Sequence, residues 1–241
     1  MTSSTTGAGS HYNHEPQLAS HLPRTPSFVG TGLWMEDSTF LDREKDLPSD
    51  FYSSRTFTDK LLSFFRERSA EDKEKPFLAC LTFTAPHWPL QAPPEVIAKY
   101  KGKYDGGPEV LRKSRLAALQ RLGLVPNDVT PAPVLAMGTT AWDELSADEK
   151  AESARAMEIF AAMVDEMDAQ IGRVLDYLRD EDGSLDETFV LFMSDNGAEG
   201  QVMEAMPVLN GVSMAEVIAK YYDNRLENMG SKTSYVWYGP R

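Results

Sequence analysis

Two short apolar runs stand out from the amphipathic pattern of this sequence, and they predict buried β-strands. One covers residues 77–84 (FLACLTFT) and the other covers residues 188–193 (TFVLFM). Apolar side chains fill consecutive positions instead of alternate ones, which is typical of strands buried on both faces of a sheet. Turn residues close both runs, because Ala85-Pro86 follows the first and Ser194-Asp195-Asn196-Gly197 follows the second.

Helical periodicity dominates between and around these runs. The strongest pattern covers residues 147–178, where apolar side chains recur every three or four positions behind a capping box that joins Ser146 and Glu149. Shorter helical patterns cover residues 57–68, 94–104, 110–122 and 217–222. Thr56 or Thr58 is expected to cap the helix at 57–68. A last run at residues 234–238 is strand-like.

The order strand, helices, strand predicts a parallel pair of strands joined by a crossover connection. Parallel strands end on the same edge of a sheet, and ligands of open α/β sheets bind just outside that edge. We therefore expect His87, which follows the first strand, to lie on the same rim as Asp195 and Asn196, which follow the second.

Asp195 and Asn196 support two interpretations. A carboxylate and an amide carbonyl are hard oxygen donors, suited to Ca²⁺ or Mg²⁺. The sequence Asp-Asn-Gly after a strand is also an ordinary turn, since Asp and Asn bond their own backbone and Gly accepts positive φ. The role of His87 also has two interpretations. Its imidazole can contact an anion or protonate a leaving group, or it can be a structural histidine bonded to a backbone carbonyl.

The composition narrows the classes of function. The 241 residues carry a formal net charge of −13, which argues against a nucleic-acid-binding protein and against docking on anionic membranes. Cys80 is the only cysteine, so neither an intrachain disulfide nor a cysteine-based zinc site is expected, and its apolar run predicts a core thiol. No signal peptide or membrane span is predicted, so we expect a soluble chain, with a lean towards the cytoplasm.

Three motifs then resemble the arylsulfatases of the alkaline-phosphatase superfamily. They are APHWPLQAP at 85–93, MVDEMD at 163–168 and MSDNGAEG at 193–200. Further stretches similar to the same family occur at 7–12, 226–228 and 234–241, so the resemblance covers nearly the whole chain. It divides the chain into a loop or poorly ordered segment at 1–30 and a partial sulfatase domain at 31–241.

The resemblance implies an α/β fold with a mixed, mostly parallel sheet between helices. It also implies hydrolysis of a small sulfated ester with a bound divalent cation, Ca²⁺ or Mg²⁺. By position, Asp195 and Asn196 match two metal ligands of the family, and His87 matches a histidine that contacts the substrate sulfate. A divalent cation offsets the negative charge of a sulfate, which agrees with these roles.

The sequence also departs from the family pattern. The family nucleophile is a formylglycine made from the cysteine of Cys-X-Pro-Ser-Arg, and Cys80 is followed instead by Leu81-Thr82-Phe83. The paired aspartates expected near the start, the Gly-Lys-Trp-His-Leu-Gly stretch and a lysine beyond Gly239-Pro240-Arg241 have no counterpart. The chain thus resembles the middle of a sulfatase, and two ligands from one loop predict weak Ca²⁺ binding.

Two alternatives remain open beside the sulfatase hypothesis. In the first, the chain is a truncated, non-catalytic remnant that acts through binding or interaction. In the second, it is a hydrolase of phosphate or phosphonate esters from the same superfamily.

A chain of residues 1–241 is predicted to be inactive by itself, because covalent catalysis requires a nucleophile. The measurement is release of the phenol from an aryl sulfate by the purified chain. Appreciable hydrolysis would contradict the prediction.

Overall fold

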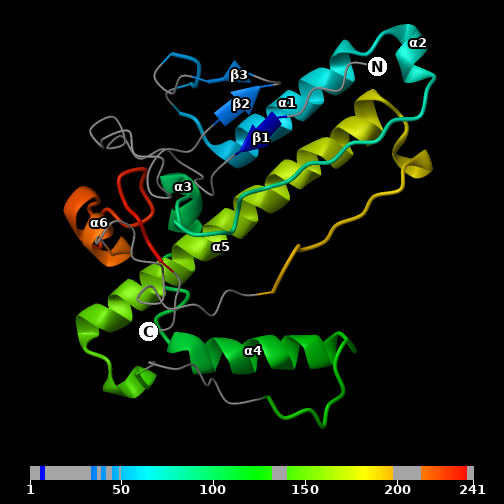
Figure 1. Ribbon diagram of the computed structural model, residues 1–241. Coiled ribbons are helices and arrows are strands. Elements are labelled where there is room, and N and C mark those ends of the chain that lie inside the picture. Colours follow the sequence, from blue (N-terminus) through cyan, green and yellow to red (C-terminus); the bar gives the residue numbers. More distant parts are fainter. Residues whose placement is uncertain are drawn as a thin grey trace.

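The computed structural model describes residues 6–8, 34–36, 39–41, 45–48, 50–131, 140–197 and 213–237. Figure 1 shows these parts as helices grouped around one long helix. The described helices are α1 (Ser53–Glu67), α2 (Ala70–Lys73), α3 (Pro94–Ile97), α4 (Gly107–Arg121), α5 (Ala147–Asp176) and α6 (Met214–Tyr221). The described strands are β1 (Thr6–Ala8), β2 (Trp34–Glu36) and β3 (Thr39–Phe40).

The long helix α5 begins as the sequence predicts. The Ser146 hydroxyl accepts from the backbone N–H of Glu149, and the Glu149 side chain accepts from the backbone N–H of Ser146. Both bonds satisfy N–H groups that a helix start otherwise leaves without a partner. The helix runs for 30 residues, and a π-helical turn at Tyr177–Glu181 continues it, close to the predicted end at 178.

The main core lies on one face of α5. Ile159, Ala162 and Met163 are fully buried there. They belong to one hydrophobic cluster with residues of the segment 85–97, among them Leu90 and Ile97. Fully burying a side chain of the size of isoleucine or methionine stabilises a protein by about 1.5–3 kcal/mol. The long helix therefore holds the segment that follows the first predicted strand.

A second contact joins α1 to the same helix. The Arg55 guanidinium donates to both carboxylate oxygens of Glu166, at 2.7 and 2.9 Å, and the Gln170 amide donates to Glu166 at 2.7 Å. The hydrogen bonds to Glu166 raise the pKa of Arg55 above its ordinary value. Because Glu166 is buried, this paired geometry compensates its loss of hydration.

The helices predicted from the sequence are confirmed, with shifted ends. The helix predicted at 57–68 begins earlier, at Ser53, and its N-cap residue Tyr52 makes no side-chain capping bond. The prediction of a threonine cap is wrong, because Thr56 and Thr58 both lie inside α1. The Thr58 hydroxyl donates to the carbonyl of Ser54. The pattern at 94–104 forms α3 and a 3-10 turn at Ala98–Tyr100.

The sheet of the described residues differs from the predicted one. It has three short strands in the order β1-β2-β3, and both pairings are antiparallel, with Gly7 opposite Met35 and Met35 opposite Phe40. The predicted mixed, mostly parallel sheet is not confirmed. The strand-like run expected at 234–238 forms no strand over residues 234–237, and residue 238 lies outside the described ranges.

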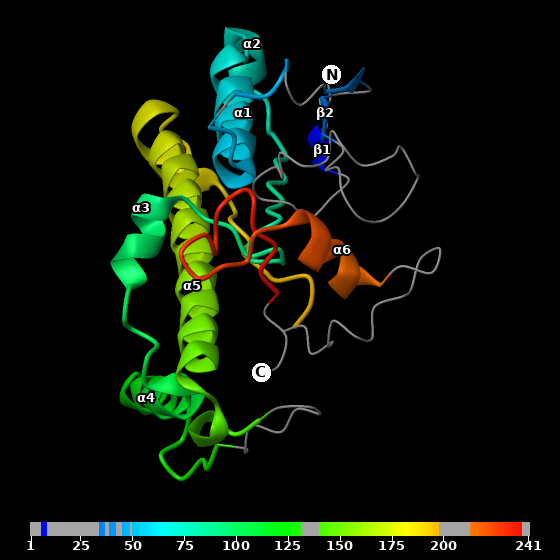
Figure 2. The same ribbon diagram turned by 90° about the vertical axis from the view of Figure 1, so that its left-hand side faces the viewer.

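The two apolar runs are extended segments that join no sheet, so the prediction of buried strands is wrong for the described structure. Leu78 is 97% exposed and Phe189 is 89% exposed. Cys80 is exposed as well, which corrects the predicted core thiol. The physical reason is that a strand is stabilised by its neighbours, and no described strand pairs with either run. In Figures 1 and 2 both segments run in the same direction alongside α5.

Within the described ranges, no helix combines the length and the apolar composition that crossing a bilayer requires.

Gly230→Ala is predicted to destabilise the chain by about 2–4 kcal/mol. Gly230 has a φ of +93°, and a Cβ atom there would lie 2.8 Å from Cδ1 of Ile97 and 3.0 Å from Cγ1 of Ile159. The substitution therefore adds a steric clash in the main core to an unfavourable backbone conformation. Urea denaturation gives the free energy of unfolding.

Gly123→Ala is the matched control, because Gly123 has a φ of +70° and nothing within 4 Å of the added Cβ. It isolates the backbone cost, expected to be about 1–2 kcal/mol. Equal losses for the two variants would show that the contact of Gly230 with the core does not matter.

Candidate functional site

The loop that carries His87 is held by the C-terminal segment of the described chain. The backbone N–H of Leu90 donates to the carbonyl of Val236 at 2.9 Å, and that of Ala92 donates to the carbonyl of Gly230 at 3.1 Å. Between them, the buried Gln91 amide donates to the carbonyl of Ser234 at 2.9 Å. These bonds fix residues 90–92 against residues 230–236, far away in the sequence.

The other side of the same loop is held by α1. The Tyr52 hydroxyl donates to the backbone carbonyl of Gln91 at 3.2 Å. Burial and the nearby Glu166 carboxylate raise the pKa of Tyr52 well above its ordinary value, so its hydroxyl remains a donor. The loop is thus bonded from two directions.

A pair of reciprocal bonds fixes the C-terminal segment itself. The Asn224 side chain donates to the carbonyl of Tyr235 at 2.9 Å and accepts from the Tyr235 backbone N–H at 2.7 Å. Asn224 thereby does for Tyr235 what a neighbouring strand does in a sheet. Neither Gln91 nor Asn224 was predicted as a positioning residue. Gln91 lies between the apolar Leu90 and Ala92, which is a signal for an amide that bonds the backbone, whereas Asn224 lies between Asp223 and Arg225 and gives no such signal.

The His87 ring lies against Trp88, which belongs to an aromatic cluster. The centroid of the His87 ring lies 4.7 Å from that of Trp88, and Trp88 stacks on Trp237 with 4.2 Å between the centroids. Trp88 and Tyr235 form one hydrophobic cluster with Met214, Ile218 and Tyr222, contributed by α6 and the residue after it. Ser213 caps α6 through a capping box with Glu216, so the position of this helix is also fixed by its sequence.

The His87 ring is oriented by the backbone. Its Nδ1 atom lies 2.6 Å from the carbonyl oxygen of Trp88, at a half-buried position. A carbonyl accepts only, so Nδ1 carries the hydrogen in this bond and the neutral ring has its lone pair on Nε2. This is the backbone bond of the structural interpretation. A histidine that acts through Nε2 also needs a bond at Nδ1 to fix its ring. Both the structural and the functional interpretation of His87 therefore stay open.

Asp195 and Asn196 lie at the end of the second extended segment, and both are exposed. The Ser194 hydroxyl donates to the Asn196 carbonyl at 2.7 Å, which is a local turn bond. Within the described ranges, no group of three or more His, Cys, Asp or Glu side chains is placed to hold a metal ion. The proximity of His87 to Asp195 and Asn196 stays a prediction.

Comparison with known proteins finds a family model and several relatives that are similar to this chain in sequence. A family model described as Sulfatase matches residues 9–227. An uncharacterized sulfatase of Schizosaccharomyces pombe is 50% identical over 98% of this chain and 40% of its own length. An arylsulfatase of Klebsiella aerogenes is 38% identical over 80% of this chain and 39% of its own length.

A more distant relative is a multifunctional alkaline phosphatase superfamily protein of Trinickia caryophylli, 26% identical over 66% of this chain and 30% of its own length. The chain therefore spans about two fifths or less of the length of these curated relatives. The Sulfatase match implies an α/β fold of the alkaline-phosphatase type, although the described part is mostly helical.

Asn224→Ala is predicted to destabilise the chain by about 1–3 kcal/mol, because it leaves the backbone N–H and carbonyl of the buried Tyr235 without these partners. Urea denaturation measures the loss, and hydrogen exchange at the Tyr235 amide should accelerate.

Asn127→Ala, at an exposed position, is the control and should change the stability by less than about 0.5 kcal/mol. An Asn224→Ala variant as stable as this control, with unchanged exchange at Tyr235, would contradict the positioning role of Asn224.

Proposed function

Because the chain belongs to the sulfatase family, we propose that it carries part of a site that hydrolyses sulfate monoesters. The Sulfatase match supports this proposal because it includes both predicted parts of the site. These parts are the loop with His87 and the turn with Asp195 and Asn196. The reaction class is sulfuric ester hydrolysis, and the arylsulfatase of Klebsiella aerogenes suggests an aryl sulfate as the ester.

In this proposal Asp195 and Asn196 hold a divalent cation, Ca²⁺ or Mg²⁺. Their carboxylate and amide oxygens are chemically suited to such an ion, and their exposure leaves them accessible. They supply two donors, whereas Ca²⁺ takes about six to eight, so the described residues do not form a complete site. A bound cation would offset the charge of the sulfate group and polarise its S–O bonds.

His87 contacts the sulfate in this proposal. The bond from Nδ1 to the Trp88 carbonyl holds the ring in one orientation, so Nε2 is the atom that faces the ester. A neutral ring can accept a hydrogen bond at Nε2. A protonated ring can donate one to a sulfate oxygen or pass the proton to the departing oxygen.

The aromatic side chains beside His87 suit an aryl ester. Trp88 and Trp237 stack at 4.2 Å, and Trp237 is half-buried, so part of its surface remains accessible. Offset stacking on such a ring is worth about 0.5–1.5 kcal/mol beyond the area that it buries. The indole pair therefore offers a surface for an aryl leaving group next to the imidazole.

The chain encodes no Cys-X-Pro-Ser-Arg, and the exposed Cys80 lies in a different sequence context. We therefore propose that residues 1–241 bind a sulfate ester without turning it over. The whole protein's hydrolysis depends in this proposal on a nucleophile that residues 1–241 do not provide.

Binding of 4-nitrophenyl sulfate by the purified chain in the presence of Ca²⁺ tests the proposal. We expect the NMR signals of the His87 ring to shift on titration, and His87→Ala to weaken binding by about tenfold, the cost of one hydrogen bond to a charged group. Asp195→Asn should remove the dependence of binding on Ca²⁺.

Phenyl phosphate and 4-nitrophenol serve as controls for the same titration. Preference for the phosphate ester would favour a phosphate or phosphonate hydrolase, and equal binding of 4-nitrophenol would show that the sulfate is not recognised. Binding of the sulfate ester that is unchanged by His87→Ala would overturn the assignment of His87.

A further inference from the structure

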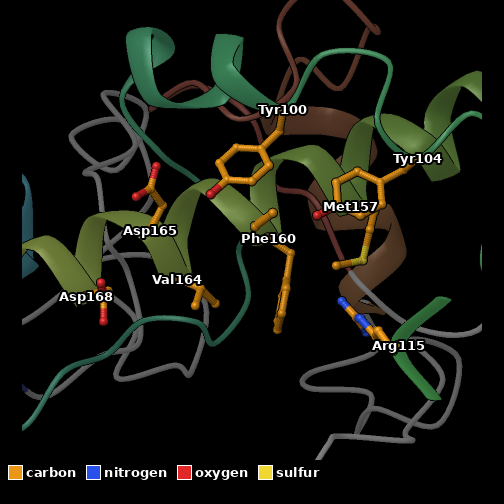
Figure 3. Close-up of a pocket in the computed structure, with 9 residues that line it drawn as sticks. Tyr100, Tyr104, Arg115, Met157, Phe160, Val164, Asp165 and Asp168 are labelled. Carbon is orange, nitrogen blue, oxygen red and sulfur yellow. The ribbon is translucent and has the colours of Figure 1, made fainter. Parts of the chain in front are cut away.

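A separate cavity lies along a face of α5 that the proposed sulfate site does not use. Its volume is about 440 Å³, within the range of about 300–1,000 Å³ that is typical of small-molecule sites. Met157, Phe160 and Val164 line it from α5, and Tyr100 and Tyr104 line it from the turn after α3 and the loop that follows. Figure 3 shows these side chains around a common space.

The charged groups of the cavity are arranged at its two ends. In Figure 3, the carboxylates of Asp165 and Asp168 lie towards one end and the guanidinium of Arg115, from α4, lies towards the other. Asp168 is exposed and makes no hydrogen bond or ion pair with the described residues. Asp165 accepts from Lys99 at 3.0 Å, so Asp168 contributes a carboxylate that is not already paired.

The aromatic rings between these ends favour a cation over a neutral ligand. A positive charge is attracted to the face of an aromatic ring, by about 0.5–1 kcal/mol at exposed sites and about 2 when desolvated. The Tyr100 ring already makes such a contact with this chain's own Lys103, whose Nζ lies 4.7 Å from the ring centroid. Phe160, Tyr104 and the polarisable sulfur of Met157 extend this apolar lining.

We propose that this cavity binds an organic ammonium compound with an aromatic body. The ammonium group lies beside Asp168 and Asp165, and the aromatic body packs over Phe160 and Met157. The Asp168 carboxylate, unpaired among the described residues, and the formal net charge of −13 disfavour an anion at this end of the cavity. The proposal is independent of the sulfatase site, because none of its residues belongs to that site.

Titration of the purified chain with phenethylammonium, followed by the NMR signals of the Met157 methyl group, tests the proposal. The matched ligand is 2-phenylethanol, which keeps the aromatic body and replaces the ammonium by a hydroxyl. We expect the cation to bind about tenfold more tightly than the alcohol. The double variant Asp165→Asn with Asp168→Asn should remove that preference.

Asp148→Asn, an exposed position on the same helix outside the cavity, is the control and should retain the preference. Far-UV circular dichroism and the thermal midpoint establish that each variant is folded. Equal binding of cation and alcohol, or no shift of the Met157 signal, would overturn the proposal. A Met157 signal that changes with protein concentration alone would overturn it too, because a second copy of the chain would then occupy the cavity.

Discussion

The burial of one face of α5 against residues 85–97 is the interaction on which the rest of the described structure depends. Ile159, Ala162 and Met163 are inaccessible to solvent, and they form one core with Leu90 and Ile97. Helix propensity alone gives α5 little stability, since most helical stability in proteins comes from packing of an apolar face. The same contact positions the loop with His87, so the residues that stabilise the fold also hold the proposed site in place.

The sequence predicted those parts of the structure that depend on residues close together in the chain. The capping box of Ser146 and Glu149 and the apolar periodicity behind it gave the start of α5 and nearly its end. The other predicted helices follow from the same periodicity, with ends displaced by a few positions, whereas the short α2 was not predicted. The threonine cap failed because Thr58 bonds to the carbonyl of Ser54 inside α1, a competition that spacing alone does not reveal.

What the sequence could not predict depends on partners far away in the chain. The runs at 77–84 and 188–193 have the composition of central strands, but a strand needs neighbours, and no described strand lies beside either run. Their side chains are consequently exposed, including Phe189 and Cys80. The aromatic cluster of Trp88, Tyr235 and Trp237 was missed for the same reason, since its members are joined by packing across more than a hundred positions.

His87, Asp195 and Asn196 illustrate how this difference affects the site. The loop with His87 is fixed by bonds from Tyr52, Val236 and Ser234, and its ring is oriented by a backbone carbonyl. Asp195 and Asn196 follow an exposed segment, and the bond beside them among the described residues is a local turn bond. A metal site needs ligands held to within a fraction of an ångström. The imidazole is therefore preorganised by the described fold, whereas the two oxygen donors depend on further contacts to become so.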